Sequence, residues 1–160
     1  MKWWSGEPRA TGSIRGASIT YLGQYTHTVD EKGRVSLPAR FRDGEPGQTF
    51  VVTRGIGPCL FLYPEDAWSR VVERLDRQKA RTDPEQRRFF LQLMQNTVET
   101  SIDGQGRLSI PPRLAELAGI EREIVFVGAG EVIEMWNPKR YTEYIGSADR
   151  EFDQWLERFL

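Results

Sequence analysis

The sequence predicts an α+β protein with a mainly β core, built from two tandem copies of one βα unit. The first observation is a duplicated pentapeptide, DEKGR at residues 30–34 and DGQGR at residues 103–107, separated by 73 residues. The second is that short runs of alternating apolar and polar residues surround both pentapeptides, a period typical of half-buried strands. The third is that prolines, glycines and apolar residues at helical spacing follow at matching positions.

The duplication extends well beyond the pentapeptide. HTVDEKGRVSLPARF from His27 aligns without a gap with TSIDGQGRLSIPPRL from Thr100. The glycine-rich segments GIG at residues 55–57 and GAG at residues 128–130 keep the same offset. Each half is therefore expected to contain a strand, a tight turn, a strand, a short helix, a strand, a glycine-rich turn, a strand and a helix.

The acid and the glycine of each pentapeptide are expected to build the tight turn. Asp30 and Asp103 can accept hydrogen bonds from backbone N–H groups of their own turns. Gly33 and Gly106 can adopt the positive φ that a reversal of the chain needs. These four residues are therefore predicted to be turn-forming.

The strand after each turn is expected to present an arginine on its outer face. Alternation along RVSLP and RLSIP puts the apolar residues on one face and Arg34 or Arg107 on the other. Pro38 and the pair Pro111 and Pro112 end these strands and suit the first turn of a helix. The two arginines are therefore predicted to emerge beside the tips of two hairpins.

Two helices are predicted between the halves, with a break near Thr82–Pro84, and a further helix at the C-terminus. The interval from Trp68 to Phe90 holds seven basic and four acidic residues, a mixture more typical of a solvated helix face than of a dedicated site. The C-terminal DREFDQWLERFL has one apolar helical face that could cap the core or contact a neighbouring subunit. The apolar stripes expected to make core or subunit contacts are Trp68, Val71, Val72 and Leu75 in one helix and Phe89, Phe90, Leu93 and Met94 in the next.

Composition excludes several classes of protein. Lys and Arg total 22 against 23 Asp and Glu, so a net charge of −1 gives no basic footprint over the whole chain, and a nucleic-acid surface must be local. The single cysteine, Cys59, cannot form an internal disulfide and is expected to be a buried thiol. No run resembles an export signal or a membrane span, so a cytoplasmic protein without a membrane partner is expected.

The sequence has one histidine, one cysteine and no G-x-S-x-G, H-E-x-x-H or P-loop pattern. It therefore predicts no enzyme activity, cofactor, metal or small-molecule substrate.

Four segments together resemble the MraZ family of bacterial transcriptional regulators: GQYTHTVDEKGRVSLPARFRD, TRGIGPCLFLYPEDAW, QRRFFLQL and IDGQGRLSIPPRLAELAGI. The resemblance covers about Tyr21 to Tyr144, and the doubled D-x-x-G-R pattern with its fixed spacing is specific. It implies the swapped-hairpin superfamily that includes AbrB and the antitoxin MazE. The implied fold is two tandem swapped-hairpin βα repeats that form one pseudo-two-fold barrel with flanking helices, which would bring both arginines to one edge.

The resemblance divides the chain into five parts. Residues 1–20 precede the strand with which chains of the family usually begin, and are expected to be a flexible extension, a misassigned start or a segment foreign to the natural chain. The remaining parts are a first SpoVT-AbrB-like repeat at 21–82, a connecting helix at 83–97, a second repeat at 98–145 and a C-terminal helix at 146–160.

What the resemblance implies is a sequence-specific DNA-binding regulator, expected to be a repressor, that forms a ring-shaped homo-oligomer. Its expected targets are short direct repeats in the promoter of the division and cell-wall gene cluster, including its own gene, and its expected location is the cytoplasmic nucleoid. The D-x-x-G-R arginine of the family maps onto Arg34 and Arg107. Other residues expected at the DNA are Lys32, its second-half equivalent Gln105, and the matched pair Arg40 and Arg113, for which a structural salt bridge is the alternative.

A protein-interaction or antitoxin-like module that assembles without promoter-specific binding is the second hypothesis, since the fold alone does not choose between them. Binding through arginines must weaken steeply with added salt, whereas capture of a partner through apolar stripes should change little. His27 is expected to be a satisfied histidine at a strand edge rather than a functional group.

Overall fold

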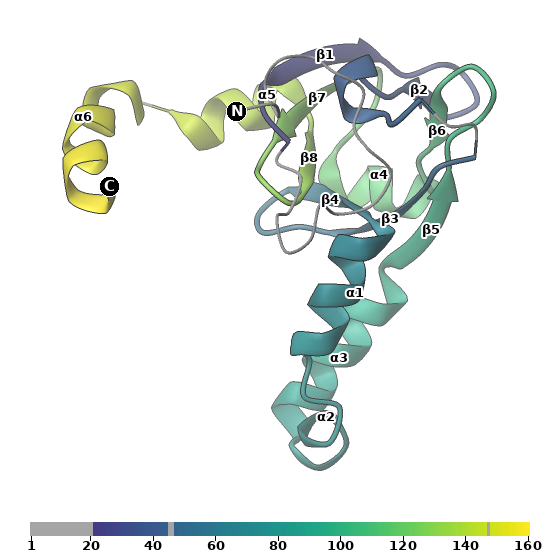
Figure 1. Ribbon diagram of the computed structural model, residues 1–160, viewed down its shortest axis with the longest axis vertical. Helices are drawn as coiled ribbons and strands as arrows, with labels where there is room; N and C mark the ends of the chain where they lie inside the picture. The colour runs from purple at the N-terminus through teal and green to yellow at the C-terminus, as the bar shows by residue number, and fades with distance from the viewer. Residues whose placement is uncertain (1–20, 45–46, 147) are drawn as a thin grey trace.

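An antiparallel sheet of six strands forms the centre of the molecule (Figure 1). The computed structural model describes residues 21–44, 47–146 and 148–160, so the expectation for residues 1–20 lies outside the described residues. The predicted α+β class with a mainly β core is confirmed, and the strand pairs of the described sheet are antiparallel. In spatial order the strands are β1 (Gln24–Thr28), β7 (Glu123–Gly128), β8 (Ile133–Trp136), β4 (Cys59–Pro64), β3 (Thr49–Arg54) and β5 (Thr97–Ser101).

The two halves of the chain interleave in this sheet. β1 of the first half pairs with β7 of the second, with Tyr25 opposite Phe126. In the same way β5 of the second half pairs with β3 of the first, with Val98 opposite Val52. Because β4 and β8 pair at the centre, the strand order is preserved when the halves are exchanged, as a pseudo-two-fold axis requires.

A separate two-stranded ribbon joins the two turns. β2 (Arg34–Ser36) and β6 (Arg107–Ser109) pair antiparallel, with Val35 directly opposite Leu108. Both of these side chains are 1% exposed. Two more backbone bonds tie the ribbon to the turns, because Leu37 N–H donates to the carbonyl of Gly106 at 3.0 Å and Ile110 N–H donates to that of Gly33 at 3.0 Å.

The described strands do not close into the barrel that the resemblance to the MraZ family implies. β1 and β5 are the two edges of the six-stranded sheet, and each has one neighbour in it. β2 and β6 pair with each other over three residues instead of joining these edges. Pro38 and Pro111 follow the ribbon strands closely, and a proline lacks the N–H that would extend the ladder. The architecture is an open sheet with a ribbon packed on the same core.

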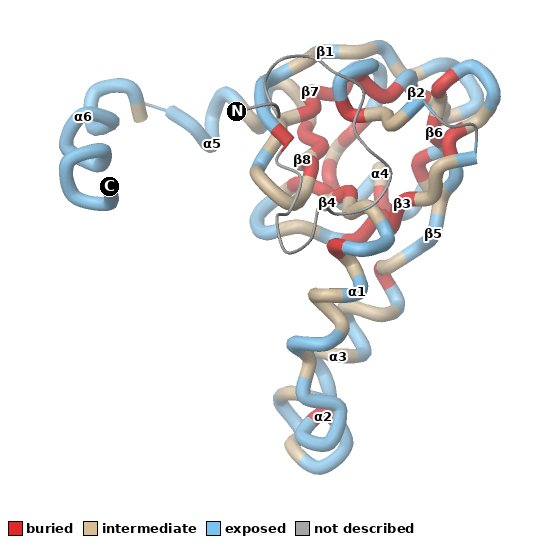
Figure 2. Tube along the Cα trace, in the orientation of Figure 1, coloured by how far each residue is buried: buried red, intermediate tan, exposed pale blue. Residues whose placement is uncertain are grey.

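One apolar core connects the ribbon, the sheet and the short helix α4 (Pro112–Ala118). Leu108 of the ribbon, Leu114 of α4 and Phe126 of the sheet belong to the same buried cluster. Figure 2 shows this buried interior as the red part of the tube, enclosed by tan and blue segments. The position of the ribbon is therefore fixed by burial as well as by hydrogen bonds.

The short helices of the two halves differ in length. α4 has seven residues, whereas its counterpart η2 (Ala39–Phe41) is a single 3-10 turn of three residues. The sequence explains the difference, because the second half continues PRLAELAG with good helix formers, while RFRDGEPG in the first half brings glycine and proline. α4 ends at Gly119, whose φ of 65° is left-handed.

Three helices form a hairpin that extends away from the sheet (Figure 1). They are α1 (Glu65–Arg74), α2 (Lys79–Thr82) and α3 (Pro84–Gln95). The break expected near Thr82–Pro84 is present, because the Asp83 carboxylate caps α3 by accepting from the N–H of Glu85 at 3.0 Å. A second break was not expected: α1 ends at Arg74, and Asp76 then accepts from the N–H groups of Gln78 and Lys79.

Two helices follow the last strand, α5 (Pro138–Ile145) and α6 (Ala148–Phe159). Asn137 caps α5 by accepting from the N–H groups of Lys139 and Arg140. α6 stands apart from the sheet in Figure 1, so in the single chain it does not cap the core. No helix in the described part of the chain has both the length and the apolar character to cross a membrane.

Candidate nucleic-acid interface

The first turn is organised around the carboxylate of Asp30. Its Oδ1 accepts from the backbone N–H groups of Lys32 and Arg34, each at 2.9 Å. Its Oδ2 accepts from Nε of Arg34, also at 2.9 Å. The backbone closes the same loop, since Gly33 N–H donates to the Asp30 carbonyl at 3.1 Å. One carboxylate thus shapes the turn and orients the arginine that follows it.

The second turn repeats this arrangement around Asp103. Its Oδ1 accepts from the backbone N–H groups of Gln105 at 2.8 Å and Arg107 at 3.0 Å. Its Oδ2 accepts from Nε of Arg107 at 2.9 Å. The two pentapeptides are therefore equivalent in hydrogen bonding as well as in sequence.

These contacts favour the charged form of both carboxylates. The backbone hydrogen bond from Arg34 is the largest cause that lowers the pKa of Asp30 below its ordinary value, and the Arg34 side chain lowers it further. The backbone hydrogen bond from Arg107 has the same leading effect on the pKa of Asp103. Both carboxylates are ionised at neutral pH and hold their arginines through charge-assisted bonds.

The ribbon brings the two arginines together on one face. Arg34 lies opposite Ser109, and Ser36 lies opposite Arg107, so these four residues point away from buried Val35 and Leu108. The side chains of Arg34 and Arg107 are 30% and 25% exposed. Nη1 of Arg107 also lies 3.9 Å from Oδ2 of Asp30, which links one turn to the other.

Each arginine keeps donors available beyond its aspartate. Within the described ranges, the Nη groups of Arg34 make no hydrogen bond or ion pair, whereas Nη1 of Arg107 forms the ion pair with Asp30 and its Nη2 makes none. A guanidinium fixed through Nε presents its remaining N–H groups as a planar fork, which can pair with two acceptors on one base or with phosphate oxygens. The ribbon therefore carries two pre-oriented forks on one surface.

The remaining predicted residues differ in how closely the two halves match. Lys32 and Gln105 occupy the same position in the two exposed turns, so one turn adds a positive charge there and the other a neutral amide. Arg40 lies on η2 and Arg113 in the first turn of α4, and both are exposed. Among the described residues neither makes an ion pair, so the salt-bridge alternative has no support in the structure.

The two turn glycines adopt the predicted conformation but differ in their surroundings. Gly33 has φ of 75° and Gly106 has φ of 77°. A Cβ on Gly33 would meet only a carbonyl oxygen, 3.7 Å away on Ile110. A Cβ on Gly106 would overlap the guanidinium of Arg42.

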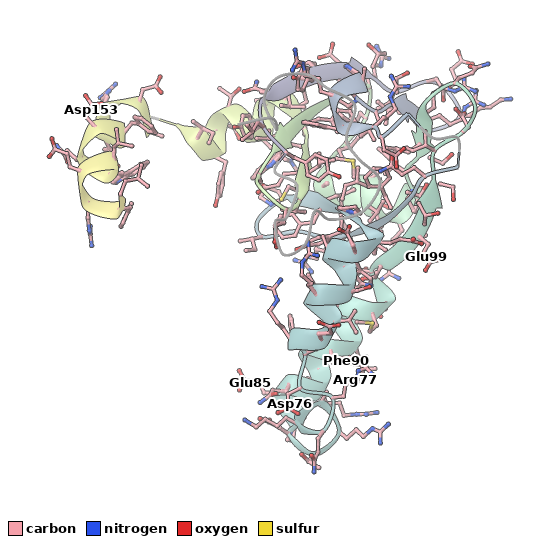
Figure 3. All side chains as sticks on the ribbon, in the orientation of Figure 1. Asp76, Arg77, Glu85, Phe90, Glu99 and Asp153 are labelled. Atoms are coloured by element: carbon pink, nitrogen blue, oxygen red, sulfur yellow. The ribbon has the colours of Figure 1, made fainter. Side chains whose placement is uncertain are left out.

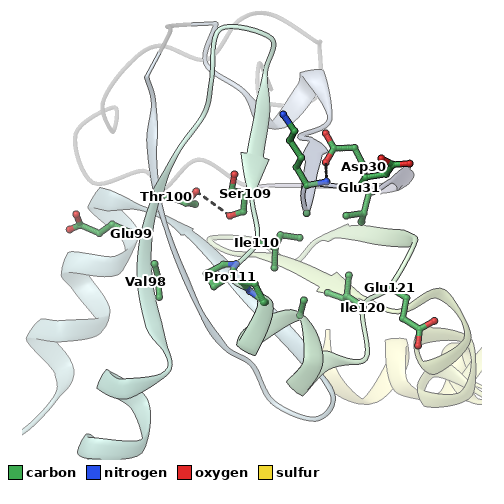
Figure 4. Close-up of a pocket in the computed structure, with 15 residues that line it drawn as sticks. Asp30, Glu31, Val98, Glu99, Thr100, Ser109, Ile110, Pro111, Ile120 and Glu121 are labelled. Carbon is green, nitrogen blue, oxygen red and sulfur yellow. Dashed lines mark hydrogen bonds between the residues drawn. The ribbon is translucent and has the colours of Figure 1, made fainter.

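The two halves also differ at Arg42, whose contact with the second turn was not predicted from the sequences of the turns. The offset of 73 residues pairs Arg42 with Ala115, so the alignment contained the signal. Arg42 covers the second turn, whereas a groove of about 610 Å³ lies beside the first turn, between it, β5 and α4, with Ala115 in its lining (Figure 4). The charged residues of the groove are Asp30, Glu31, Lys32, Glu99 and Glu121, an acidic set unsuited to phosphate.

His27 and Cys59 have structural contacts rather than a place among the candidate DNA-binding residues. The Nδ1–H of His27 donates to the Ser36 carbonyl at 2.5 Å, and its ring packs edge-on against Phe126. Burial, assisted by the nearby Glu134 carboxylate, raises the pKa of the Cys59 thiol to about 12. The thiol is therefore protonated at neutral pH and serves as a packing group.

Comparisons with known proteins cover both halves. The family model described as "MraZ protein, putative antitoxin-like" matches residues 20–91 and again 93–160, so the match includes α6. A relative from Syntrophomonas wolfei is 36% identical over 140 residues, 88% of this chain and 96% of the relative. Relatives from Caldanaerobacter subterraneus and Thermomicrobium roseum are each 40% identical, over 85% and 76% of this chain and 94% and 84% of their own lengths. All three carry the name "Transcriptional regulator MraZ".

Alanine at the two turn glycines is expected to destabilise the protein unequally. Both Gly33→Ala and Gly106→Ala place a Cβ at positive φ, which costs about 1–2 kcal/mol. Gly106→Ala should cost more, because the new methyl group must displace Arg42. Denaturant unfolding measures both losses, and an Arg42→Ala background should remove the difference between them. Equal losses in the natural background would contradict this account of the second turn.

The turn carboxylates predict an acid-dependent part of the stability. Because the pKa of both Asp30 and Asp103 is lowered in the folded protein, their contribution is complete above the ordinary value of 3.8 and is lost as the pH falls through the lowered pKa. The melting temperature of the double variant Asp30→Asn, Asp103→Asn should therefore lie below that of the natural chain at neutral pH and approach it at the acid end. Glu116→Gln, at an exposed position of α4, is the control. A difference in melting temperature between the double variant and the natural chain that stays constant down to strong acid would refute the assignment.

Proposed function

Because the chain belongs to the MraZ family, we propose that it is a transcriptional regulator that reads DNA through the outer face of the β2–β6 ribbon. The observation that carries the proposal is the placement of the Arg34 and Arg107 guanidiniums on one surface, each held by an aspartate of its own turn. The relatives carry the name of a transcriptional regulator, which supports a role in the regulation of transcription.

A two-stranded ribbon has a suitable size and chemistry for this task. The major groove of B-DNA is about 12 Å wide and admits such a ribbon, and its guanine O6 and N7 atoms accept from an arginine fork. Fixing each fork before binding lowers the entropic cost of making the contact. Lys32, Arg40 and Arg113 are then candidates for phosphate contacts, while Gln105 replaces the charge at the second turn.

The proposed location, assembly and target genes are those that the resemblance to the MraZ family implies. We place the protein in the cytoplasm on the nucleoid, as a ring-shaped homo-oligomer that represses the division and cell-wall gene cluster and its own promoter. The near-neutral chain fits repeated weak contacts better than one strong electrostatic contact, because affinity then comes from tethering several subunits along one DNA. The strand exchange between the halves supports two interlocked swapped-hairpin units as the origin of the paired turns.

The description of the matching family as antitoxin-like favours one second candidate, a module that binds a protein partner without reading a promoter. The two functions differ in their response to salt. Arginine contacts to DNA release counterions, so the logarithm of the binding constant should fall linearly with the logarithm of salt concentration, whereas capture of a protein by an apolar surface should change little.

Replacing the ribbon arginines should remove DNA binding without unfolding the protein. Arg34→Ala is expected to weaken binding to the upstream region of the gene by about 1–3 kcal/mol per engaged subunit, so that specific binding is nearly lost in an assembly. Arg107→Ala should have a similar or somewhat smaller effect. Arg54→Ala, at the exposed end of β3, is the matched control and should bind as the natural chain does.

A gel-shift titration at several salt concentrations measures both the affinity and the salt slope. Loss of one arginine contact at each site should also make the slope shallower. Natural affinity in the Arg34→Ala variant, with assembly unchanged, would contradict the proposal.

The asymmetry between the turns predicts the layout of the operator. The pseudo-two-fold axis lies within each chain, and Lys32 against Gln105 and Arg42 against Ala115 make its two halves unequal. Each subunit is therefore a directional reader, and a head-to-tail ring of such readers should prefer direct repeats spaced by about one helical turn, roughly 10 bp.

Three duplexes test this layout: one repeat, several repeats in phase, and several repeats offset by half a turn. The in-phase duplex should bind most tightly, because successive repeats then face the same side of the ring. Equal affinity for the single and in-phase duplexes, or a preference for inverted repeats, would exclude the ring reader even if the protein binds DNA.

A further inference from the structure

α6 has an apolar face that nothing in the described part of its own chain covers. Phe152, Trp155, Leu156 and Phe159 recur at helical spacing and are 55%, 39%, 44% and 69% exposed. Figure 1 shows α6 standing clear of the sheet, and Figure 2 shows it exposed along nearly its whole length. Four large apolar side chains on one face of a solvent-exposed helix are typical of a contact surface.

The charges of α6 restrict what can cover that face. Asp149 and Asp153 lie on one flank of the apolar stripe and Glu151 on the other, as a helical period of 3.6 residues requires. In total the helix has four acidic residues against two arginines. The partner surface should therefore be apolar in the middle and positive at its borders.

The distal half of the α1–α3 hairpin, residues 74–90, has this character. It carries six basic residues against three acidic ones. Two of the three acids already accept backbone N–H groups: Asp83 as the cap of α3, and Asp76 in the turn before α2. Near the middle of α3, Phe89 is 57% exposed. The exposed basic residues of this half are Arg74, Arg77, Lys79, Arg81, Arg87 and Arg88.

Length and placement make the two elements suitable partners in different copies of the chain. α6 and α3 have twelve residues each, so at about 1.5 Å per residue both are roughly 18 Å long and can pack side by side. The two elements extend from different sides of the sheet, as the positions of Asp153 on α6 and Arg77 on the hairpin show in Figure 3. One chain therefore does not place its own α6 against its own hairpin.

We propose that the apolar face of α6 docks along α3 of a second copy of this chain, with the acidic flanks of α6 against the basic residues of the distal hairpin. Because the two surfaces are different, the contact is head-to-tail, and its repetition gives a ring or a filament rather than a closed two-fold dimer. The inference rests on the proposed assembly and specifies the interface that would hold it together.

The first test uses the full chain with single substitutions and light scattering coupled to size-exclusion chromatography. Trp155→Asp, on the docking face, and Phe89→Asp, on the hairpin, should each reduce the assembly to single subunits. Gln154→Ala, on the opposite side of α6, is the control and should assemble as the natural chain does. An unchanged assembly in the Trp155→Asp variant would overturn the proposal.

Charge reversal provides a second test that does not depend on the apolar substitutions. A chain with Asp149→Lys and Asp153→Lys, and another with Arg81→Glu and Arg88→Glu, should each fail to assemble alone, because like charges then face one another. Mixing the two should restore assembly, since every reversed helix then meets a complementary surface. Natural assembly of either variant alone, or no recovery in the mixture, would refute the interface.

Measurements of DNA binding distinguish a failure of this interface from a failure of the proposed DNA-binding function. Trp155→Asp should lose the advantage of in-phase repeats yet bind a single repeat as one natural subunit does, whereas Arg34→Ala should assemble normally and lose binding to both DNAs. If the hairpin variant Arg81→Glu, Arg88→Glu assembles normally but binds DNA at least 10-fold more weakly, the basic hairpin contacts DNA instead of α6, and the proposal is wrong.

Discussion

The antiparallel pairing of β2 with β6 is the constraint on which the rest of the candidate site depends. Val35 and Leu108 face each other across the ribbon and are both buried, so the residues on either side of them in each strand must point outward. A shift of the register by one residue would bury two arginines and expose two core residues. The same pairing brings the turns close enough for Arg107 to approach Asp30. The geometry of the arginines is thus fixed by the core beneath them.

Duplication and divergence have different consequences in this fold. Duplication supplies strands that pair across the halves, and it places one aspartate, one glycine and one arginine in each turn with nearly identical hydrogen bonds. The halves have diverged in the residues that pack beside the turns. Arg42 covers the second turn, whereas its counterpart Ala115 lines a groove beside the first. A symmetric scaffold can therefore carry an asymmetric surface, which is what a directional reader of DNA would need.

The repeat made much of the local structure predictable. β5 and β6 begin 73 residues after β1 and β2, and both turn glycines have positive φ. Two features depended on contacts between segments distant in sequence and were not predicted: the open sheet, and the overlap between Arg42 and any side chain at residue 106. The early end of α1 was not predicted either, and there Asp76 accepts from N–H groups only two and three residues along the chain. The spacing of apolar residues predicts whether a segment forms a helix or a strand. It does not predict which strands pair, or which side chain packs into a given space. For that reason the alignment of Arg42 with Ala115 did not predict that the arginine covers one turn and the alanine lines a groove beside the other.

Hydrogen exchange of the full chain, with and without a duplex from the upstream region of its own gene, tests the central claim most directly. If the ribbon face reads DNA, the amides of residues 30–36 and 103–109 should gain protection together, while the helical hairpin at 74–90 keeps the exchange rate it has without DNA. Protection of the hairpin with no change at the two turns would contradict the account, because the arginines held by Asp30 and Asp103 would then lie away from the DNA.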